Sequence, residues 1–350
     1  MKKIFAYLLA AVMMTWTLGG CSSSNGAAAG SDGLSIVVTI FPEYDWVMNV
    51  LGDNPAGAEV TLLLDNGVDL HSYQPSVDDI MKIANCDLFI YVGGESDEWV
   101  EDALSEAVNK DMIVINLLEE LGDSVKEEEI VEGMQEDEHE HHHDHDEDDD
   151  EDEHHHDDDE DEDEDHHEEG PEYDEHVWLS LKNAAKLTES ISAALQTIDP
   201  DNANVYAGNS AAYVGELLSL DAEYADAVKS ASGNTLLFGD RFPFRYMTDD
   251  YGLDYYAAFV GCSAESEASF ETITFLSGKV DELGLNCVLT IEGKDHSIAE
   301  TIVQNTDSKD QKVLTLDSMQ SVTASDIANG VTYISVMNSN LEVLKEALSY

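Results

Sequence analysis

Histidine is the residue type whose placement is most unusual, because ten of the thirteen histidines lie between residues 139 and 167. Every residue from 136 to 169 is an aspartate, a glutamate or one of these histidines. Imidazole beside carboxylate suits borderline divalent ions such as zinc, and a segment without apolar residues cannot join a core. We therefore expect a mobile loop that collects metal through His139, His141, His142, His143, His145, His154, His155, His156, His166 and His167.

Three histidines remain in ordinary sequence, far apart along the chain: His71, His176 and His296. With Asp240 they would form a four-coordinate set for Zn²⁺, and a set without an open position favours holding a metal over using it in catalysis. Taken singly, each histidine is more often a surface or capping residue than a ligand. His296 could cap a helix that starts at Ser297, and Asp240 could pair with a neighbouring arginine.

Parallel sheets would bring these side chains together, because ligand sites in α/β units form at the carboxyl ends of strands. Short apolar runs rich in β-branched residues alternate with helical segments in both halves of the chain. The predicted strands span 35–40, 58–64, 87–92 and 112–117 in the first half, and 235–238, 255–260, 287–291 and 313–316 in the second. His71, Asp240 and His296 each follow one of these strands, which predicts a cleft between two lobes.

The predicted fold class is α/β, with two lobes that each hold a mostly parallel sheet flanked by helices and that are joined by a long rigid helix. Helical spacing of apolar residues places the connection at 181–196 and 201–230. The predicted domains are an N-terminal metal-binding lobe at 35–180, connecting helices at 181–231 and a C-terminal metal-binding lobe at 232–350. A disordered acidic, histidine-rich insert interrupts the first lobe at about 126–172.

The first residues have the pattern of an export signal. Lys2 and Lys3 precede an apolar run, 4–18, that is too short for a stable membrane span. Leu-Gly-Gly-Cys at 18–21 resembles the bacterial lipobox, which implies a signal peptide at 1–20, a lipid on Cys21 and a flexible tether at 21–34. An ordinary signal peptide with a chance cysteine is the alternative. We expect an extracytoplasmic protein, anchored to the cell membrane by acyl chains.

The charge of the chain indicates a cation as its ligand. The formal net charge is −61, and residues 127–175 hold 31 of the 76 acidic residues without any lysine or arginine. The rest of the chain is still strongly acidic. Nucleic acid is excluded as a partner, because phosphate binding needs the opposite sign. We expect a monomer.

The cysteines after residue 21 give no clear framework, because Cys86, Cys262 and Cys287 are odd in number and lack C-x-x-C spacing. Cys262 and Cys287 lie in or after apolar, strand-like runs. They could form a disulfide outside the cytoplasm, or remain as buried free thiols. The sequence leaves both possibilities open.

Four local segments resemble one family, the zinc and manganese solute-binding lipoproteins of ABC transporters. GVDLHSYQPS at 67–76 resembles its signature G-x-D-x-H-x-Y-x-P-S, and EHVWLSLKNA at 175–184 resembles H-x-W-L-x-P with Leu181 in place of proline. FRYMTDDYGL at 244–253 and SAESEAS at 263–269 resemble two further motifs of the second lobe. The acidic insert between the first two motifs is typical of the zinc-transporting members.

This resemblance implies that His71 and His176 are the first two metal ligands. The family's third position is occupied here by Arg241, whose guanidinium donates only and cannot ligate; Asp240 is the expected substitute. Glu292 matches a family glutamate that ends a strand, and His296 falls at about the position of the fourth ligand. The expected metal residues are therefore His71, His176, His296, Asp240 and Glu292.

The resulting hypothesis is a lipoprotein that captures Zn²⁺ in an interlobe cleft and delivers it to an ABC permease for uptake. Uptake of Mn²⁺ or Fe²⁺ is the first alternative, although three imidazoles argue against ions that prefer oxygen. A surface protein that buffers metal or acts as an adhesin, without a transporter, is the second. We expect no enzyme activity, because the chain has no H-E-x-x-H motif.

Overall fold

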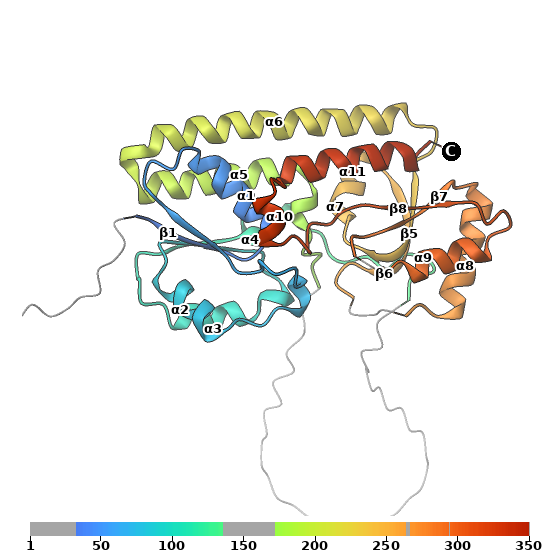
Figure 1. Cartoon of the computed structure of the whole chain (residues 1–350), viewed down its shortest axis with the longest axis horizontal. Helices are drawn as coiled ribbons and strands as arrows, with labels where there is room; N and C mark the ends of the chain where they lie inside the picture. Colours follow the sequence, from blue (N-terminus) through green and yellow to red (C-terminus); the bar gives the residue numbers. More distant parts are fainter. Residues whose placement is uncertain (1–32, 136–171, 264–266, 294, 350) are drawn as a thin grey trace, which may run out of the picture. The chain divides into compact units, whose positions relative to one another are not determined.

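Short buried strands alternate with helices through both halves of the chain, as the hydrophobic pattern predicts. The computed structural model describes residues 33–135, 172–263, 267–293 and 295–349. The predicted signal peptide, Cys21 and the ten clustered histidines lie outside these residues. Figure 1 shows two sheets, each with four parallel strands and flanking helices, which confirms the predicted fold class.

The first sheet has the strand order β2-β1-β3-β4, and every pairing in it is parallel. Its strands are β1 (Ser35–Val38), β2 (Glu59–Leu62), β3 (Leu88–Tyr91) and β4 (Ile113–Asn116). The helical elements of this half are α1 (Phe41–Leu51), η1 (Leu70–Ser72), α2 (Val77–Asn85), η2 (Glu95–Asp97), α3 (Trp99–Ser105), α4 (Leu117–Leu121) and η3 (Gly122–Ser124). Because the strands are parallel, the carboxyl ends of β1, β2 and β3 lie along the same side of the sheet.

The second sheet repeats this arrangement in the order β6-β5-β7-β8. Its strands are β5 (Thr235–Phe242), β6 (Asp254–Val260), β7 (Cys287–Thr290) and β8 (Lys312–Thr315). Its helices are α7 (Arg245–Tyr251), α8 (Phe270–Leu283), α9 (Ser297–Asn305), α10 (Ala324–Ala328) and α11 (Tyr333–Ala347).

Three helical elements connect the sheets: η4 (Val177–Leu179), α5 (Leu181–Ile198) and, after the turn η5 (Pro200–Asn202), α6 (Ala203–Ser230). Helix α6 has 28 residues and packs against α1, α5 and α11 (Figure 1). Tyr213 donates its hydroxyl to Asp45 in α1 at 2.9 Å, and Tyr224 donates to the carbonyl of Met337 in α11 at 2.6 Å. One helix is thus bonded to both halves.

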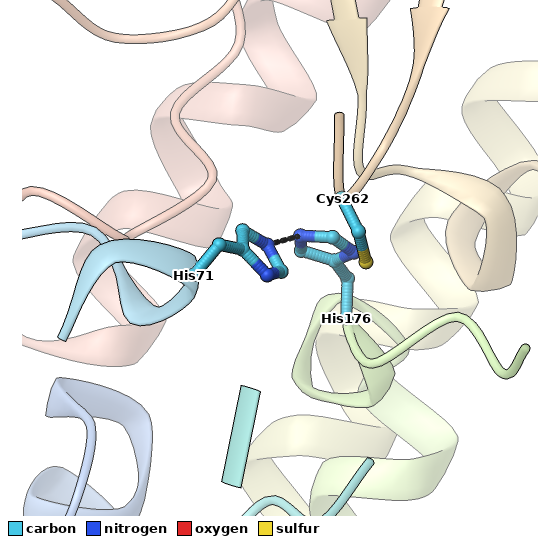
Figure 2. A group of neighbouring side chains, drawn as sticks. All are labelled: His71, His176 and Cys262. Carbon is cyan, nitrogen blue, oxygen red and sulfur yellow. Dashed lines mark hydrogen bonds between the residues drawn. The ribbon is translucent and has the colours of Figure 1, made fainter. Parts of the chain in front are cut away.

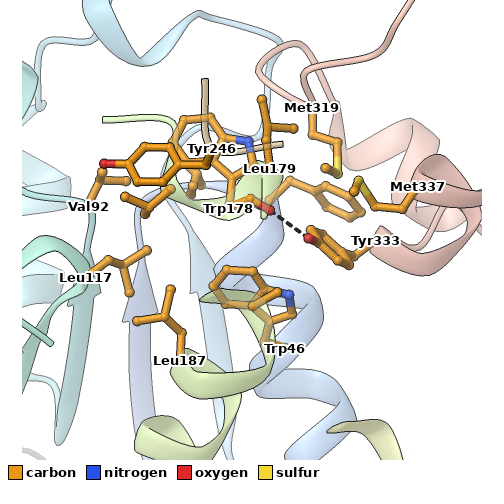
Figure 3. Packing of buried hydrophobic residues seen from close by; sticks show 14 of the residues in the cluster. Trp46, Val92, Leu117, Trp178, Leu179, Leu187, Tyr246, Met319, Tyr333 and Met337 are labelled. Carbon is orange, nitrogen blue, oxygen red and sulfur yellow. Dashed lines mark hydrogen bonds between the residues drawn. The ribbon is translucent and has the colours of Figure 1, made fainter. Parts of the chain in front are cut away.

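Both halves also share one apolar core. Figure 3 shows Trp46 of α1, Trp178 of η4 and Tyr333 of α11 packed together, and all three are at most 1% exposed. The Tyr333 hydroxyl donates to the carbonyl of Trp178 at 2.6 Å. A second, smaller core lies behind the second sheet and includes Leu237 and Phe259. Residues 33–350 form one compact unit. This division does not separate the two predicted lobes, so their boundaries stay a prediction.

Two predicted elements differ from the structure. The strand predicted at 235–238 is longer in the structure, where β5 continues to Phe242 through a bulge between Phe238 and Arg241. Gly239 lies against α9, where an added Cβ would come within 2.5 Å of the Ala299 Cα atom. The C-terminal helix predicted from about 324 is two helices, separated at Gly330 with φ of 94°.

Two observations bear on export and oxidation. Cys86, Cys262 and Cys287 are free thiols, so the structure has no disulfide between Cys262 and Cys287. None of the helices in the described parts of the chain combines the length and the apolar character that a bilayer span requires.

Candidate metal centre

His71 is positioned by the turn that follows β2. Asp69 precedes the short helix η1, and its Oδ1 atom accepts from the backbone N–H of His71 at 3.0 Å. Leu70 anchors the turn in the core at 1% exposure. Oδ2 of Asp69 accepts from Arg241 Nη2 at 2.7 Å, which ties this turn to the second sheet. The side chain of His71 keeps 12% of its surface exposed.

His176 is fully buried at the start of η4. Asp174 accepts twice from it, from the backbone N–H at 2.8 Å and from the ring Nδ1 at 3.0 Å. The carbonyl of Asp174 in turn accepts from the hydroxyl of Tyr246, in α7, at 2.8 Å. Tyr246, which belongs to the motif at 244–253, therefore holds the backbone of Asp174, whose carboxylate orients His176.

The two imidazoles meet edge to edge. Figure 2 shows their Nε2 atoms facing each other, at a separation of 3.2 Å. The Nδ1 atom of His71 lies 2.7 Å from Ser96 Oγ and 3.4 Å from Glu175 Oε2. Because a carboxylate lies at each Nδ1, each ring is expected to carry its proton there and to direct its Nε2 lone pair at the other ring.

The spacing of these lone pairs fits a shared cation. Two nitrogens that bind a tetrahedral zinc at about 2.0–2.1 Å lie about 3.3 Å apart. The observed separation of 3.2 Å is close to this value. Two lone pairs at this distance without a cation or a proton between them would repel. The residue types, the tautomers and the distance therefore all suit a divalent metal.

A third donor, the thiol of Cys262, lies beside the histidine pair. The ligand atoms of His71, His176 and Cys262 are all within 4.8 Å of one another (Figure 2). The preceding Gly261 packs on the imidazole, since an added Cβ there would lie 3.0 Å from His176 Cε1. The backbone N–H of Cys262 donates to Glu128 Oε1 at 3.1 Å. Burial, followed by the charge of Glu128, raises the pKa of this thiol well above its ordinary value.

The surroundings of the pair are acidic and favour a cation. Burial lowers the pKa of His176, but the charge and hydrogen bond of Asp174 and the charges of Glu175 and Asp69 together outweigh burial and raise the pKa above its ordinary value. Burial works against the charge of Glu175, yet its bonds to His71 and Ser96 lower its pKa. The lowered pKa keeps Glu175 ionised beside the His71 ring, where it stabilises positive charge.

The other predicted ligands are held in contacts of their own. Asp240 Oδ2 accepts from Thr290 Oγ1 at 2.6 Å and from the backbone N–H of Ile291 at 3.2 Å. Thr290 Oγ1 also lies 3.0 Å from His296 Nδ1. Asp240 and His296 thus share one threonine between β5 and α9. His296 precedes α9, but its side chain does not cap that helix.

Glu292 anchors a loop. Its carboxylate accepts from the backbone N–H of Ser318 at 2.6 Å, from Ser318 Oγ at 2.8 Å and from the backbone N–H of Gln320 at 3.0 Å. The structure therefore brings His71 and His176 together and places Asp240, His296 and Glu292 outside their three-residue group. The role of these three as ligands stays a prediction.

Sequence reasoning missed the side chains around the histidines: Ser96, Asp174 and Glu175, which contact the rings, and Glu128, which accepts from the backbone of Cys262. The pair Asp174-Glu175 directly precedes His176. Because metal-bound histidines usually donate their second N–H to a carboxylate, this adjacency was a readable signal. The approach of Cys262 had no such signal, because it depends on the packing of Gly261.

Residues 126–128 and 172–174 pair with each other next to this centre. Glu127 and Tyr173 form an antiparallel bridge, Glu128 donates its backbone N–H to Glu172 at 3.0 Å, and Asp174 donates its own to Lys126 at 2.9 Å. This stem, residues 126–128 and 172–174, carries both Glu128 and Asp174. The stem is therefore in direct contact with the histidine site, through the bond from His176 Nδ1 to Asp174.

Comparison with protein families gives a match over nearly all of the described chain. The family model described as "Zinc-uptake complex component A periplasmic" matches residues 36–347. This match confirms the resemblance drawn from the four motifs.

Two relatives illustrate the range of similarity. The zinc-binding lipoprotein AdcA of Streptococcus pneumoniae is 32% identical over 351 residues, which cover 99% of this chain and 61% of AdcA. The high-affinity zinc uptake system protein ZnuA of Bacillus subtilis is 27% identical over 343 residues, which cover 98% of this chain and 96% of ZnuA. The chain thus spans less than two thirds of the length of the AdcA relative.

A solved structure supports the fold. The Zn(II)-bound ZnuA-like domain of Streptococcus pneumoniae AdcA matches with a TM-score of 0.66 and 28% identity, over 91% of this chain and 100% of that domain. Its strands and helices therefore follow the same path as those described above.

Proposed function

We propose, given that this chain belongs to the family of zinc-uptake complex component A periplasmic proteins, that it captures Zn²⁺ between His71 and His176 and delivers it to an ABC permease. The family is the solute-binding part of a transport complex. Zinc is the cargo of such a protein, which holds the ion and releases it without chemical change.

One observation carries this proposal: the two Nε2 atoms lie 3.2 Å apart, each on a ring whose Nδ1 faces a carboxylate. Imidazole nitrogen suits zinc, whereas Mn²⁺ prefers carboxylate, carbonyl and water. The relatives named above bind or take up zinc according to their names. Both lines of support favour zinc over manganese or iron.

The absence of enzyme activity is part of the same proposal. A catalytic zinc needs an open position and a base aimed at its water. Here Asp174 accepts from His176 Nδ1 at 3.0 Å, and Glu175 accepts from the backbone N–H of Ser96 at 2.9 Å. The centre is therefore suited to holding a metal.

Two further parts of the proposal concern residues outside the described chain. The ten histidines between 139 and 167 would raise the local concentration of zinc next to the stem. Cys21 would carry the lipid that holds a monomeric protein at the outer face of the cell membrane, where the permease receives the ion. Mass spectrometry of the membrane fraction, searching for a diacylated residue 21, tests the anchor.

Zinc titration against a chromophoric chelator tests the site. His71→Ala should lower the affinity for the tightly bound ion by well over tenfold, since each outer-shell partner alone contributes about 10–100-fold. His296→Ala is the matched variant, because its Nδ1 contacts Thr290 and not the pair. We expect it to bind like the parent. An equal loss of zinc affinity in both variants would show that His296 is also a ligand, as the sequence predicted. Unchanged affinity in His71→Ala would refute the site.

A further inference from the structure

We propose that the sulfur of Cys262 is the third protein ligand of the captured ion, so that the centre has two nitrogens and one thiolate. This inference rests on the proposed function, because it names a further donor for the same site. It assigns a role to a residue that the sequence presented only as a possible disulfide partner.

The first argument is distance. A tetrahedral zinc with Zn–N of about 2.0–2.1 Å and Zn–S of about 2.3 Å places nitrogen and sulfur about 3.6 Å apart. One ring nitrogen of each histidine and the Cys262 sulfur lie within 4.8 Å of one another. A shift of about 1 Å, within the reach of side-chain rotation, closes the set. Figure 2 shows the sulfur next to the His176 ring.

The second argument is that the loop of Cys262 is held in place. Gly261 lies in van der Waals contact with His176, and the N–H of Cys262 bonds to Glu128 at 3.1 Å. On the other side, Arg241 Nη1 donates to the carbonyl of Ser263 at 3.4 Å. The thiol therefore lies on a turn after β6 that these contacts hold in place. The second half of the chain thus adds a donor to the two histidines of the first half.

The third argument is that the other polar side chains around the histidine pair already have partners. Asp174 accepts from His176 Nδ1, and Glu175 accepts from the backbone N–H of Ser96 while its other oxygen lies 3.4 Å from His71 Nδ1. The nearby Arg241 is a donor only and is paired with Asp69. Among the described residues around the pair, the thiol is the soft donor left to complete the set. Thiolate selects zinc and other thiophilic ions against manganese.

The binding step is balanced without any redox partner. Zinc displaces the thiol proton: the S–H bond breaks, the S–Zn bond forms, and the proton passes to the solvent. Before the metal arrives, burial keeps the sulfur protonated and thus weakly reactive.

Cobalt substitution of the full chain tests the inference, because Co²⁺ reports its ligands in its spectrum. Thiolate ligation gives an intense sulfur-to-cobalt charge-transfer band in the near ultraviolet, and a tetrahedral site gives visible d–d bands. The parent and Cys287→Ser, the matched control for a buried thiol on β7, should show the charge-transfer band. Cys262→Ser and Cys262→Ala should lose it and should bind zinc at least about tenfold more weakly.

The outcomes separate the two proposals. Visible d–d bands without a charge-transfer band in the parent, or an unchanged band in Cys262→Ser, would overturn the thiolate ligand and leave the histidine site standing. No cobalt spectrum in the parent, together with no effect of His71→Ala, would refute the proposed function itself. Circular dichroism of the metal-free variants shows whether they fold, and the serine variant provides a folded comparison if the alanine variant does not.

Discussion

At the scale of single residues, two consecutive carboxylates govern the chemistry of the histidine pair. Asp174 faces His176 and Glu175 faces His71, so that one short segment sets the protonation of both rings. A carboxylate behind an imidazole fixes the tautomer and raises the basicity of the ligating nitrogen. The strength of zinc binding should therefore depend on residues that never touch the ion.

Asp174→Asn tests this dependence. The amide oxygen can still accept from the ring, but it lacks the charge that strengthens the ligating nitrogen. We expect zinc affinity to fall by about 10–100-fold, measured by competition with a chelator. Asp78→Asn, at an exposed carboxylate of α2, is the control and should bind like the parent. Parent-like affinity in Asp174→Asn would show that the Asp174 carboxylate has no part in metal binding.

The pH dependence of capture follows from the raised pKa of His176. Only the neutral ring binds zinc, so protons compete with the metal up to a higher pH than they do for a free imidazole, near about 6.5. Affinity should fall as the pH is lowered through this range. In Asp174→Asn the pKa of His176 drops, so that the fall should shift to lower pH. Affinity that is independent of pH between about 5 and 8 would contradict histidine ligation.

At the scale of elements, the buried Glu43 begins α1 with an unusual protonation state. Its Oε2 atom accepts from the N–H groups of Thr39 and Ile40 at 2.8 and 3.2 Å. Burial, and to a lesser extent the charge of Asp97, raises the pKa of Glu43 from 4.5 to about 8. Between these values the folded protein binds a proton that the unfolded chain has lost. The free energy of unfolding should therefore decrease as the pH rises through this window.

Glu43→Gln removes this contribution, because the amide is neutral at every pH. We expect the melting temperature of the metal-free variant to change less than that of the parent between about pH 5 and pH 8. The difference should be a few degrees, since 1 kcal/mol shifts Tm by about 2–4 °C in domains of about 150–250 residues. Glu59→Gln, on the exposed start of β2, serves as the control. Parallel pH profiles for Glu43→Gln and the parent would refute the shifted pKa.

Most elements were readable from local pattern, because apolar periodicity and capping residues lie within a few positions of the structure they specify. Ser76, directly before α2, caps that helix by accepting from the backbone N–H of Asp79. The bulge in β5 was not readable, because Gly239 serves the close approach of α9 rather than a strand end. The separation of α10 from α11 at Gly330 was also missed, because apolar residues continue on both sides of it.

The site was readable only in part, for a related reason. His71 and His176 lie in motifs whose neighbours define their turns, so their roles followed from the local sequence. The approach of Cys262 depends on contacts with Gly261 and Glu128, which come from segments far apart in the chain. Such tertiary contacts leave no period or spacing in a single sequence. His296 follows β7 as predicted, whereas Asp240 lies within β5 instead of after it, and the two side chains meet at Thr290.

At the scale of the whole molecule, the metal centre lies where both halves and the insert stem come together. Helix α6 bonds to each half, and Trp46, Trp178 and Tyr333 share one core. The buried His176 lies two residues before Trp178, so the ligand is part of this shared packing. Large hinge opening would expose these aromatic side chains at a cost of about 1.5–3 kcal/mol each. We infer that release of the ion proceeds through local rearrangement near the partly exposed His71.

Deletion of residues 136–169 separates the collecting loop from the tight site. The stem residues Glu128 and Asp174 stay in the shortened chain, so the histidine pair should keep its geometry. Calorimetric titration should show fewer zinc ions bound per chain, while the tightest affinity stays unchanged. Loss of tight binding in this variant would mean that the clustered histidines themselves form the high-affinity site.

The most direct test of the central claim is an anomalous-scattering map, recorded at the zinc edge on crystals of the zinc-loaded protein. The account predicts one strong peak within about 2.0–2.1 Å of the Nε2 atoms of both His71 and His176. A principal peak elsewhere, such as between Asp240 and His296, or a peak that touches only one of the two rings, would contradict it.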